Sequence, residues 1–376
     1  DSLSRCLRSS CGTEVIIVVN APPGADEESR LNNKLTINNI EKWKNDHPEC
    51  FFRLYTVDVT SCPVEGWGVG LARKTGMDEA LRRFDYISRP DGVILSLDAD
   101  CTVAKNYFVA VQKELLDRND RSGCSIYFEH PVSGSEYTVD VYRSIIQYEL
   151  HLRYYYQGLV WTGFPYVHHT VGSAIAVKAL NYMKVGGMNR KMAGEDFYFI
   201  QKLVPSGGYF NLNTTVIRPS PRLSFRVPFG TGPAMSKITG GSGNSFLSYN
   251  IEAFRVLKNL FGMVDKLYQC PPDDTGFLYE DLPSAIKQFV QKDEWIIRLR
   301  EIKGNTTGPA SFRKRFFGWF NMFRIVKYMN FVHSSLFDKI PVSDSAYDLL
   351  RIMKMEFSSK DPAELLTFYR KLEKEN

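Results

Sequence analysis

The chain of 376 residues has little of several features that mark particular classes of protein. Its seven cysteines form no Cys-x-x-Cys pair and no regular framework, which indicates reduced thiols and hence a cytosolic compartment. No apolar run approaches the roughly 18–20 residues of a membrane span, and no signal peptide is visible. The formal net charge of +5 is too small to predict a nucleic-acid partner.

The composition is that of a globular chain. Hydrophobic residues make up 44% and charged residues 24% of the sequence, so the chain can bury a large core and general disorder is not expected. Its length allows two or more domains of about 100–200 residues each.

Short apolar runs alternate with amphipathic helical patterns over the first two thirds of the chain. This alternation predicts an α/β fold with a mostly parallel sheet and helices on both of its faces. The predicted strands are residues 14–20, 51–58, 92–97, 125–129, 172–177 and 214–218, and the predicted helices are residues 26–46, 69–84, 103–116, 139–156 and 197–203.

A segment rich in Gly, Ser and Thr, residues 230–244, predicts a linker or a mobile loop. Residues 1–229 before it form the predicted α/β domain, and residues 245–376 after it form a predicted helical region. The helices expected there are residues 246–260, 283–303, 312–333, 344–355 and 362–373.

Two aspartates, Asp98 and Asp100, follow directly after the apolar strand predicted at 92–97. In parallel sheets, ligands bind outside the carboxyl ends of the strands. Carboxylates at i and i+2 in that place can share a hard cation such as Mg²⁺ or Mn²⁺. A solvated loop or a helix cap is the alternative, but the preceding buried strand favours a metal site.

A second acidic pair, Glu195 and Asp196, begins the helix predicted near residue 197. Such carboxylates can simply complement the helix dipole, although the glycine turn at residues 185–189 would shape a pocket beside them. Arg73 follows several glycines at the start of another predicted helix, a setting that suits a diphosphate. A solvated charged face is an equally good reading of that segment.

Six segments, taken in order, resemble family-2-type glycosyltransferases of the GT-A fold with their DxD and GED motifs. The resemblance covers residues 14 to 232. The segments are EVIIVVN (14–20), GVGLARKTGMDEAL (68–81), GVILSLDADC (92–101), HHTVGSAIAV (168–177), KVGGMNRKMAGEDFYFIQKL (184–203) and SPRLSFRVPFGTG (220–232).

The resemblance implies that residues 1–229 are a catalytic domain that binds a nucleoside-diphosphate sugar, with a UDP-sugar favoured. Asp98 and Asp100 would hold Mn²⁺ or Mg²⁺, and Asp196, beside Glu195, would be the general base of an inverting transfer. The residues placed on the donor are Asn20, Arg73, Asp98, Asp100, Arg222 and Arg226. Asn20 stands where the family often has Asp, and the family's first strand has no counterpart before residue 14.

The acceptor implied by the resemblance is a glycan or a lipid-linked hydroxyl, in the synthesis of a cell-surface polysaccharide or glycolipid. The segment 312–328 mixes basic and aromatic residues at helical spacing. It could lie on the inner face of an anionic membrane, or it could be a packed helix with a solvated basic face. The expected location is therefore the cytoplasm, with peripheral membrane contact as an option.

Two other functions stay open. A nucleotidyltransferase also uses a carboxylate-held metal beside a parallel sheet. An inactive relative that only binds sugar or a partner protein is the non-enzymatic alternative, although the intact motifs at Asp98–Asp100 and Gly194–Asp196 argue against such decay.

Overall fold

The structure, a computed structural model, describes residues 1–61, 68–191, 194–222, 245–271 and 275–375. It divides into two compact units. The first contains residues 1–145 and 168–239, and the second contains residues 146–167 and 240–375. The predicted linker at 230–244 lies outside the described residues. Residues 146–167, which the sequence analysis placed in the α/β domain, are grouped with the second unit.

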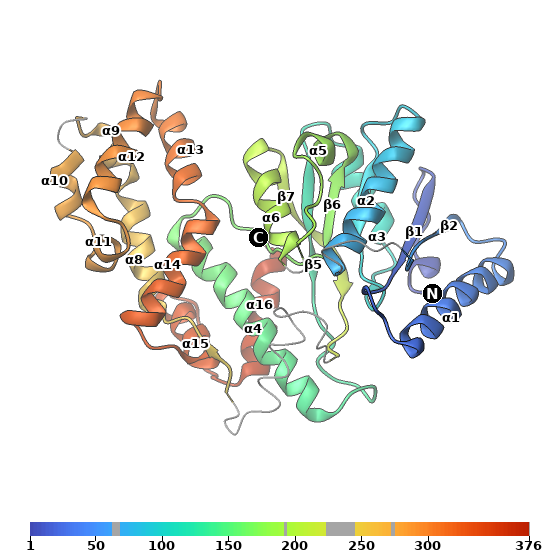
Figure 1. Cartoon of the computed structure of the whole chain (residues 1–376). Coiled ribbons are helices and arrows are strands. Elements are labelled where there is room, and N and C mark those ends of the chain that lie inside the picture. Colours follow the sequence, from blue (N-terminus) through green and yellow to red (C-terminus); the bar gives the residue numbers. More distant parts are fainter. Residues whose placement is uncertain (62–67, 192–193, 223–244, 272–274, 376) are drawn as a thin grey trace. The chain divides into compact units, whose positions relative to one another are not determined.

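The first unit contains two β-sheets, whose strands follow one another along the chain (Figure 1). They are β1 (Thr13–Asn20), β2 (Phe52–Val59), β3 (Val93–Ser96), β4 (Thr102–Val103), β5 (Gly123–Phe128), β6 (Ile175–Lys178) and β7 (Tyr209–Arg218). β1 and β2 pair in parallel, with Thr13 opposite Phe52. The other strands form one sheet in the order β3-β6-β5-β7-β4.

The larger sheet is mixed, so the prediction of a mostly parallel sheet is wrong for it. Among the described residues, only β5 and β7 pair in parallel, whereas β3 with β6, β5 with β6, and β4 with β7 are antiparallel. A strand buried on both faces reads as a continuous apolar run whichever way it points. Its direction depends on the connections. The helix between β5 and β6, α4 (Val139–Thr162), has residues 146–162 in the second unit and so is no simple crossover helix.

Helix α2 (Val69–Tyr86) contacts both sheets, through β1 and β3. Helix α3 (Tyr107–Val111) packs on β7 and continues as a π-helical turn, Gln112–Leu116. The helix predicted at 103–116 is therefore shorter, because Val103 belongs to an edge strand. The remaining helical segments of this unit are Leu3–Arg5, α1 (Glu27–Asp46), α5 (Ala179–Lys184), α6 (Glu195–Leu203) and Val204–Ser206.

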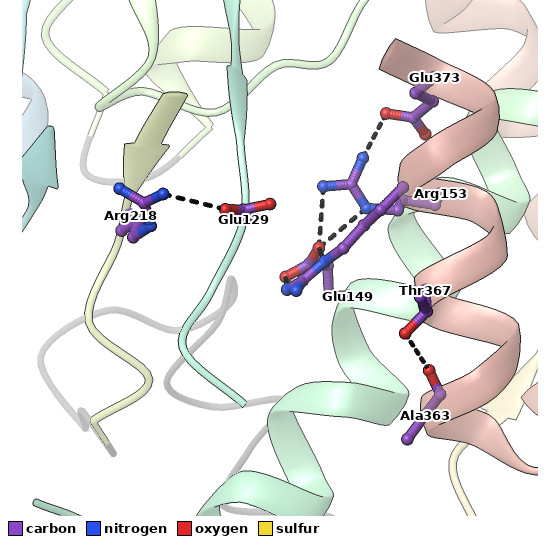
Figure 2. A network of polar contacts seen from close by, with 8 residues as sticks. Glu129, Glu149, Arg153, Arg218, Ala363, Thr367 and Glu373 are labelled. Atoms are coloured by element: carbon purple, nitrogen blue, oxygen red, sulfur yellow. Dashed lines mark hydrogen bonds and ion pairs between the residues drawn. The ribbon is translucent and has the colours of Figure 1, made fainter. Parts of the chain in front are cut away.

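The core of the first unit lies where α3 packs on the larger sheet. It is made of fully buried side chains that include Tyr107, Leu115, Ile126, Leu212 and Ile217. At the edge of this sheet, Arg218 Nη2 donates to Glu129 Oε1 at 3.2 Å (Figure 2).

The second unit is mainly helical, as the sequence predicted for the residues after 245. Besides part of α4, its elements are β8 (Leu247–Ser248), α8 (Ile251–Gly262), α9 (Val264–Gln269), α10 (Thr275–Glu280), α11 (Ser284–Phe289), α12 (Lys292–Gly304), α13 (Pro309–Trp319), α14 (Met322–Ser335), β9 (Ile340–Pro341), α15 (Val342–Ile352) and α16 (Pro362–Glu375). Two expected single helices are each broken into a pair, α11 with α12 and α13 with α14. In the described part of the chain, no helix is long and apolar enough to span a bilayer.

The aromatic residues of segment 312–328 belong to the core of the second unit. Phe312, Phe316 and Phe320 are fully buried, because their spacing of four places them on one face of α13 and at its end. Arg313 and Lys314 on the same helix are exposed. Only the basic side of this segment is thus available to meet a membrane surface.

A buried network of charges connects α4 with α16 in the second unit (Figure 2). Glu149 Oε1 accepts from Arg153 Nε at 2.8 Å and from Arg370 Nε at 2.7 Å. Arg153 also forms an ion pair with Glu373. Glu149 and Arg153 are fully buried, so their charges depend on one another rather than on solvent.

Candidate active site

Arg73 of α2 lies between carboxylates from two distant parts of the chain. Its Nη2 donates to Asp98 Oδ1 at 2.7 Å, and its Nη1 donates to Glu195 Oε1. The Arg73 side chain is 7% exposed and that of Glu195 is 3% exposed, whereas that of Asp98 is 42% exposed. The guanidinium therefore links a buried carboxylate to one at the surface of the first unit.

Close backbone packing brings α2 to the start of α6. A Cβ atom at Gly70 would lie 2.0 Å from the carbonyl oxygen of Lys191, so a larger residue would push the two segments apart. Gly194, which caps α6, has φ of 72° in the left-handed region that glycine adopts at little cost. Glu195 and Asp196 then occupy the first helical turn, where the helix dipole favours negative charge.

Asp196 lies in the same cluster, because its charge acts on Arg73 together with those of Asp98 and Glu195. Asp196 Oδ1 accepts from the backbone N–H of Phe197 at 2.7 Å. The structure thus brings together four residues that the sequence singled out separately. They are Arg73, Asp98, Glu195 and Asp196.

Burial sets the pKa of the two carboxyls on α6. It raises the pKa of Asp196, and Arg73 and the N–H groups of Phe197 and Gly172 oppose the shift without cancelling it. Burial likewise raises the pKa of Glu195 against the attraction of Arg73. For Arg73, burial lowers the pKa, but the attraction of the three carboxylates outweighs it, so the net shift is upward. A carboxyl with a raised pKa is a better proton acceptor once ionised.

Asp100, the second aspartate of the D-x-D motif, has a different partner. Arg222 Nε donates to Asp100 Oδ2 at 2.6 Å, and both side chains are partly exposed. Two carboxylates at a partly exposed edge supply the oxygen ligands that Mg²⁺ and Mn²⁺ prefer, with phosphates completing the shell. No group of three or more His, Cys, Asp or Glu side chains is arranged to hold a metal among the described residues.

Two further residues predicted to bind the donor have other placements. The Asn20 side chain donates through Nδ2 to the carbonyl of Gly68 at 3.3 Å, so it ties the end of β1 to the cap of α2. Arg226 lies outside the described residues.

The sequence analysis assigned no role to Ser96 or Gly172, although both contact this cluster. Ser96 Oγ donates to the carbonyl of Gly172 at 2.7 Å. A Cβ atom at Gly172 would lie 2.6 Å from the guanidinium atoms of Arg73. A hydroxyl within an otherwise apolar strand is a signal that could have drawn attention to Ser96, because buried hydroxyls need a partner.

Comparison with known proteins returns one solved structure to describe. The mannosyltransferase PcManGT from Pyrobaculum calidifontis, in complex with GDP-Man and Mn2+, is 12% identical, with 97% of this chain and 88% of that chain covered and a TM-score of 0.33. No family model and no curated protein sequence matches the chain. A TM-score below 0.5 does not establish a shared fold, so the function proposed below depends on the residues of the site.

Proposed function

We propose that this protein is a metal-dependent glycosyltransferase that moves a sugar from a nucleoside-diphosphate donor to an acceptor hydroxyl. One observation carries the proposal. The carboxylates of Asp98, Glu195 and Asp196 act on the single guanidinium of Arg73. Negative charge is therefore in excess, and a divalent cation beside Asp98 would balance it.

Asp98 and Asp100 are the residues that would hold the cation. Their side chains are 42% and 33% exposed, so a solvated metal and its phosphate ligands can reach them. A divalent cation at this position neutralises the charge that develops on a diphosphate leaving group. Arg222, already bonded to Asp100, would add charge-assisted hydrogen bonds to the same phosphates.

Asp196 would accept the proton of the acceptor hydroxyl as that oxygen attacks the anomeric carbon. Its raised pKa suits this role, and general-base help of this kind contributes about 10²–10⁴-fold. Direct displacement would invert the anomeric configuration. Glu195, held by Arg73, would fix the position of the helix turn that carries the base.

The wider assignment follows the sequence resemblance. It favours a UDP-sugar donor, a glycan or lipid-linked acceptor, and a role in cell-surface polysaccharide or glycolipid synthesis at the cytoplasmic face. The exposed Arg313 and Lys314 of α13 would attract an anionic bilayer.

The test is a screen of nucleotide sugars with Mn²⁺ that measures release of the nucleoside diphosphate. Wild-type protein should release it with at least one donor, and removal of the metal should stop the release. Asp196→Asn should abolish turnover while donor affinity stays near normal. The matched control, Asp91→Asn, changes an exposed aspartate paired with Arg89 and should retain full turnover.

Three other results would count against the proposal. Release of pyrophosphate from nucleoside triphosphates would identify a nucleotidyltransferase. Donor binding without turnover under any condition would identify a binding protein. Full turnover in Asp196→Asn would remove that residue from the role of base.

A further inference from the structure

A buried hydroxyl behind the acidic cluster connects strand β3 with the loop before β6. Ser96 is the last residue of β3 and is only 5% exposed. Its Oγ donates to the Gly172 carbonyl at 2.7 Å. Removing this donor would leave a buried carbonyl without that bond, a loss that costs about 1–3 kcal/mol in typical cases.

Gly172 in turn contacts both charged partners of the site. The Arg73 guanidinium lies so close to its backbone that a Cβ atom there would be 2.6 Å from Cζ and both terminal nitrogens. The backbone N–H of Gly172 also donates to the Asp196 carboxylate. A tight turn closes around this residue, since the N–H of Ala174 donates to the carbonyl of Val171 at 2.8 Å.

We propose that Ser96 is a positioning residue for the reaction: by fixing the Gly172 carbonyl, it holds the backbone that supports Arg73 and orients Asp196. This inference rests on the proposed function, in which Asp196 is the base. Ser96 does not touch the substrate in this role. It acts through Gly172, and its effect should appear in the chemical step rather than in donor binding.

The charged groups that act on Asp196 come from three elements. Arg73 extends from α2, Asp98 follows β3, and Glu195 precedes Asp196 on α6. The hydrogen bond from Gly172 favours the ionised carboxylate. If Gly172 moves away, this support is lost, so the carboxyl should protonate at a higher pH and the acid limb of the rate profile should move upward.

Ser122 offers a matched control in the same unit. Its Oγ donates to the Gly207 carbonyl at 2.6 Å, and Ser122 is also 5% exposed. Ser122→Ala therefore removes the same kind of hydrogen bond, from a buried serine to a glycine carbonyl, at a place with no contact to the cluster.

The experiment compares Ser96→Ala, Ser122→Ala and wild type with the donor and metal found in the screen. We expect Ser96→Ala to lower kcat about 10-fold or more, since small displacements of reacting groups are costly. The KM for the donor should stay unchanged, and the acid limb of kcat/KM should move to higher pH. Ser122→Ala should leave the acid limb and kcat as in wild type.

An acid limb that stays in place in Ser96→Ala, or that moves equally in Ser122→Ala, would overturn the positioning role. If Ser96→Ala does not fold, Ser96→Cys, which keeps a weaker donor, is judged by the same shift. Lack of any transfer by wild type would instead refute the proposed function, so the two failures are distinguishable.

Discussion

Arg73 and Asp98 are 25 residues apart in the sequence, yet Arg73 Nη2 donates to Asp98 Oδ1 at 2.7 Å. The first aspartate of the D-x-D motif is therefore tied to helix α2 before any ligand arrives. A planar guanidinium can hold two carboxylates at fixed angles, and Arg73 does so with Asp98 and Glu195. The sequence resemblance placed Arg73 on the donor, whereas its bonds are to carboxylates of its own chain.

Replacing Arg73 should destabilise the protein more than replacing an exposed arginine. Arg73→Ala leaves the buried Glu195 carboxylate without its counter-charge, a change that typically costs about 3–5 kcal/mol. Arg82→Ala on the same helix breaks an ion pair with Glu79 in which Arg82 is 66% exposed, and should cost no more than about 1 kcal/mol. Urea unfolding followed by circular dichroism measures both, and equal losses would contradict the clamp role of Arg73.

Removing either aspartate of the D-x-D motif should weaken donor binding only when metal is present. Asp98→Ala or Asp100→Ala deletes a proposed metal ligand, and binding of the donor phosphates depends on that metal. Isothermal calorimetry with and without Mn²⁺ measures the difference. Unchanged donor affinity with Mn²⁺ in both variants would exclude these residues as the metal site.

The raised pKa of Asp196 predicts how stability changes with pH. A carboxyl whose folded pKa lies above its unfolded value favours folding below the unfolded value, about 3.9, and that contribution is lost as pH rises through the folded pKa. At pH 7 the buried charge is a cost, so Asp196→Asn should melt at a higher temperature than wild type. Near pH 3 this difference should shrink.

The same measurement has a control of opposite sign. A hydrogen bond from Arg89 lowers the pKa of Asp91, so its contribution is present above the unfolded pKa and is lost as pH falls. Asp91→Asn should therefore melt at a lower temperature than wild type at pH 7. Thermal shifts of the same sign in both variants would contradict the assignment for Asp196.

The buried charge network of the second unit should be sensitive to loss of one partner (Figure 2). Glu149→Gln removes the carboxylate that accepts from Arg153 and Arg370, and should lower the free energy of unfolding by about 3–5 kcal/mol. Lys371→Ala on α16 breaks only an exposed pair with Glu375 and should change it by less than about 1 kcal/mol. Denaturant unfolding that gives similar values would refute the structural importance of this network.

Local sequence predicted several elements closely because their signals are local. Asp26 caps α1 by accepting from the N–H of Ser29 at 2.7 Å, and such a cap can be recognised from residue type alone. The strand predicted at 14–20 is β1, Thr13–Asn20. The short strand β4 was missed, because two residues at a sheet edge carry too little pattern to separate them from the helix that follows.

For the site, the sequence alone was enough to single out Arg73, Asp98, Glu195 and Asp196, because charged residues beside buried strands and glycine turns are conspicuous in one dimension. Only the tertiary structure decided that one guanidinium lies among the three carboxylates, that most of the larger sheet is antiparallel, and that Ser96 and Gly172 support the cluster. The physical reason is that residue type and periodicity record burial and local conformation. Partners more than a hundred residues apart, such as Arg73 and Glu195, are chosen by packing, which no local pattern contains.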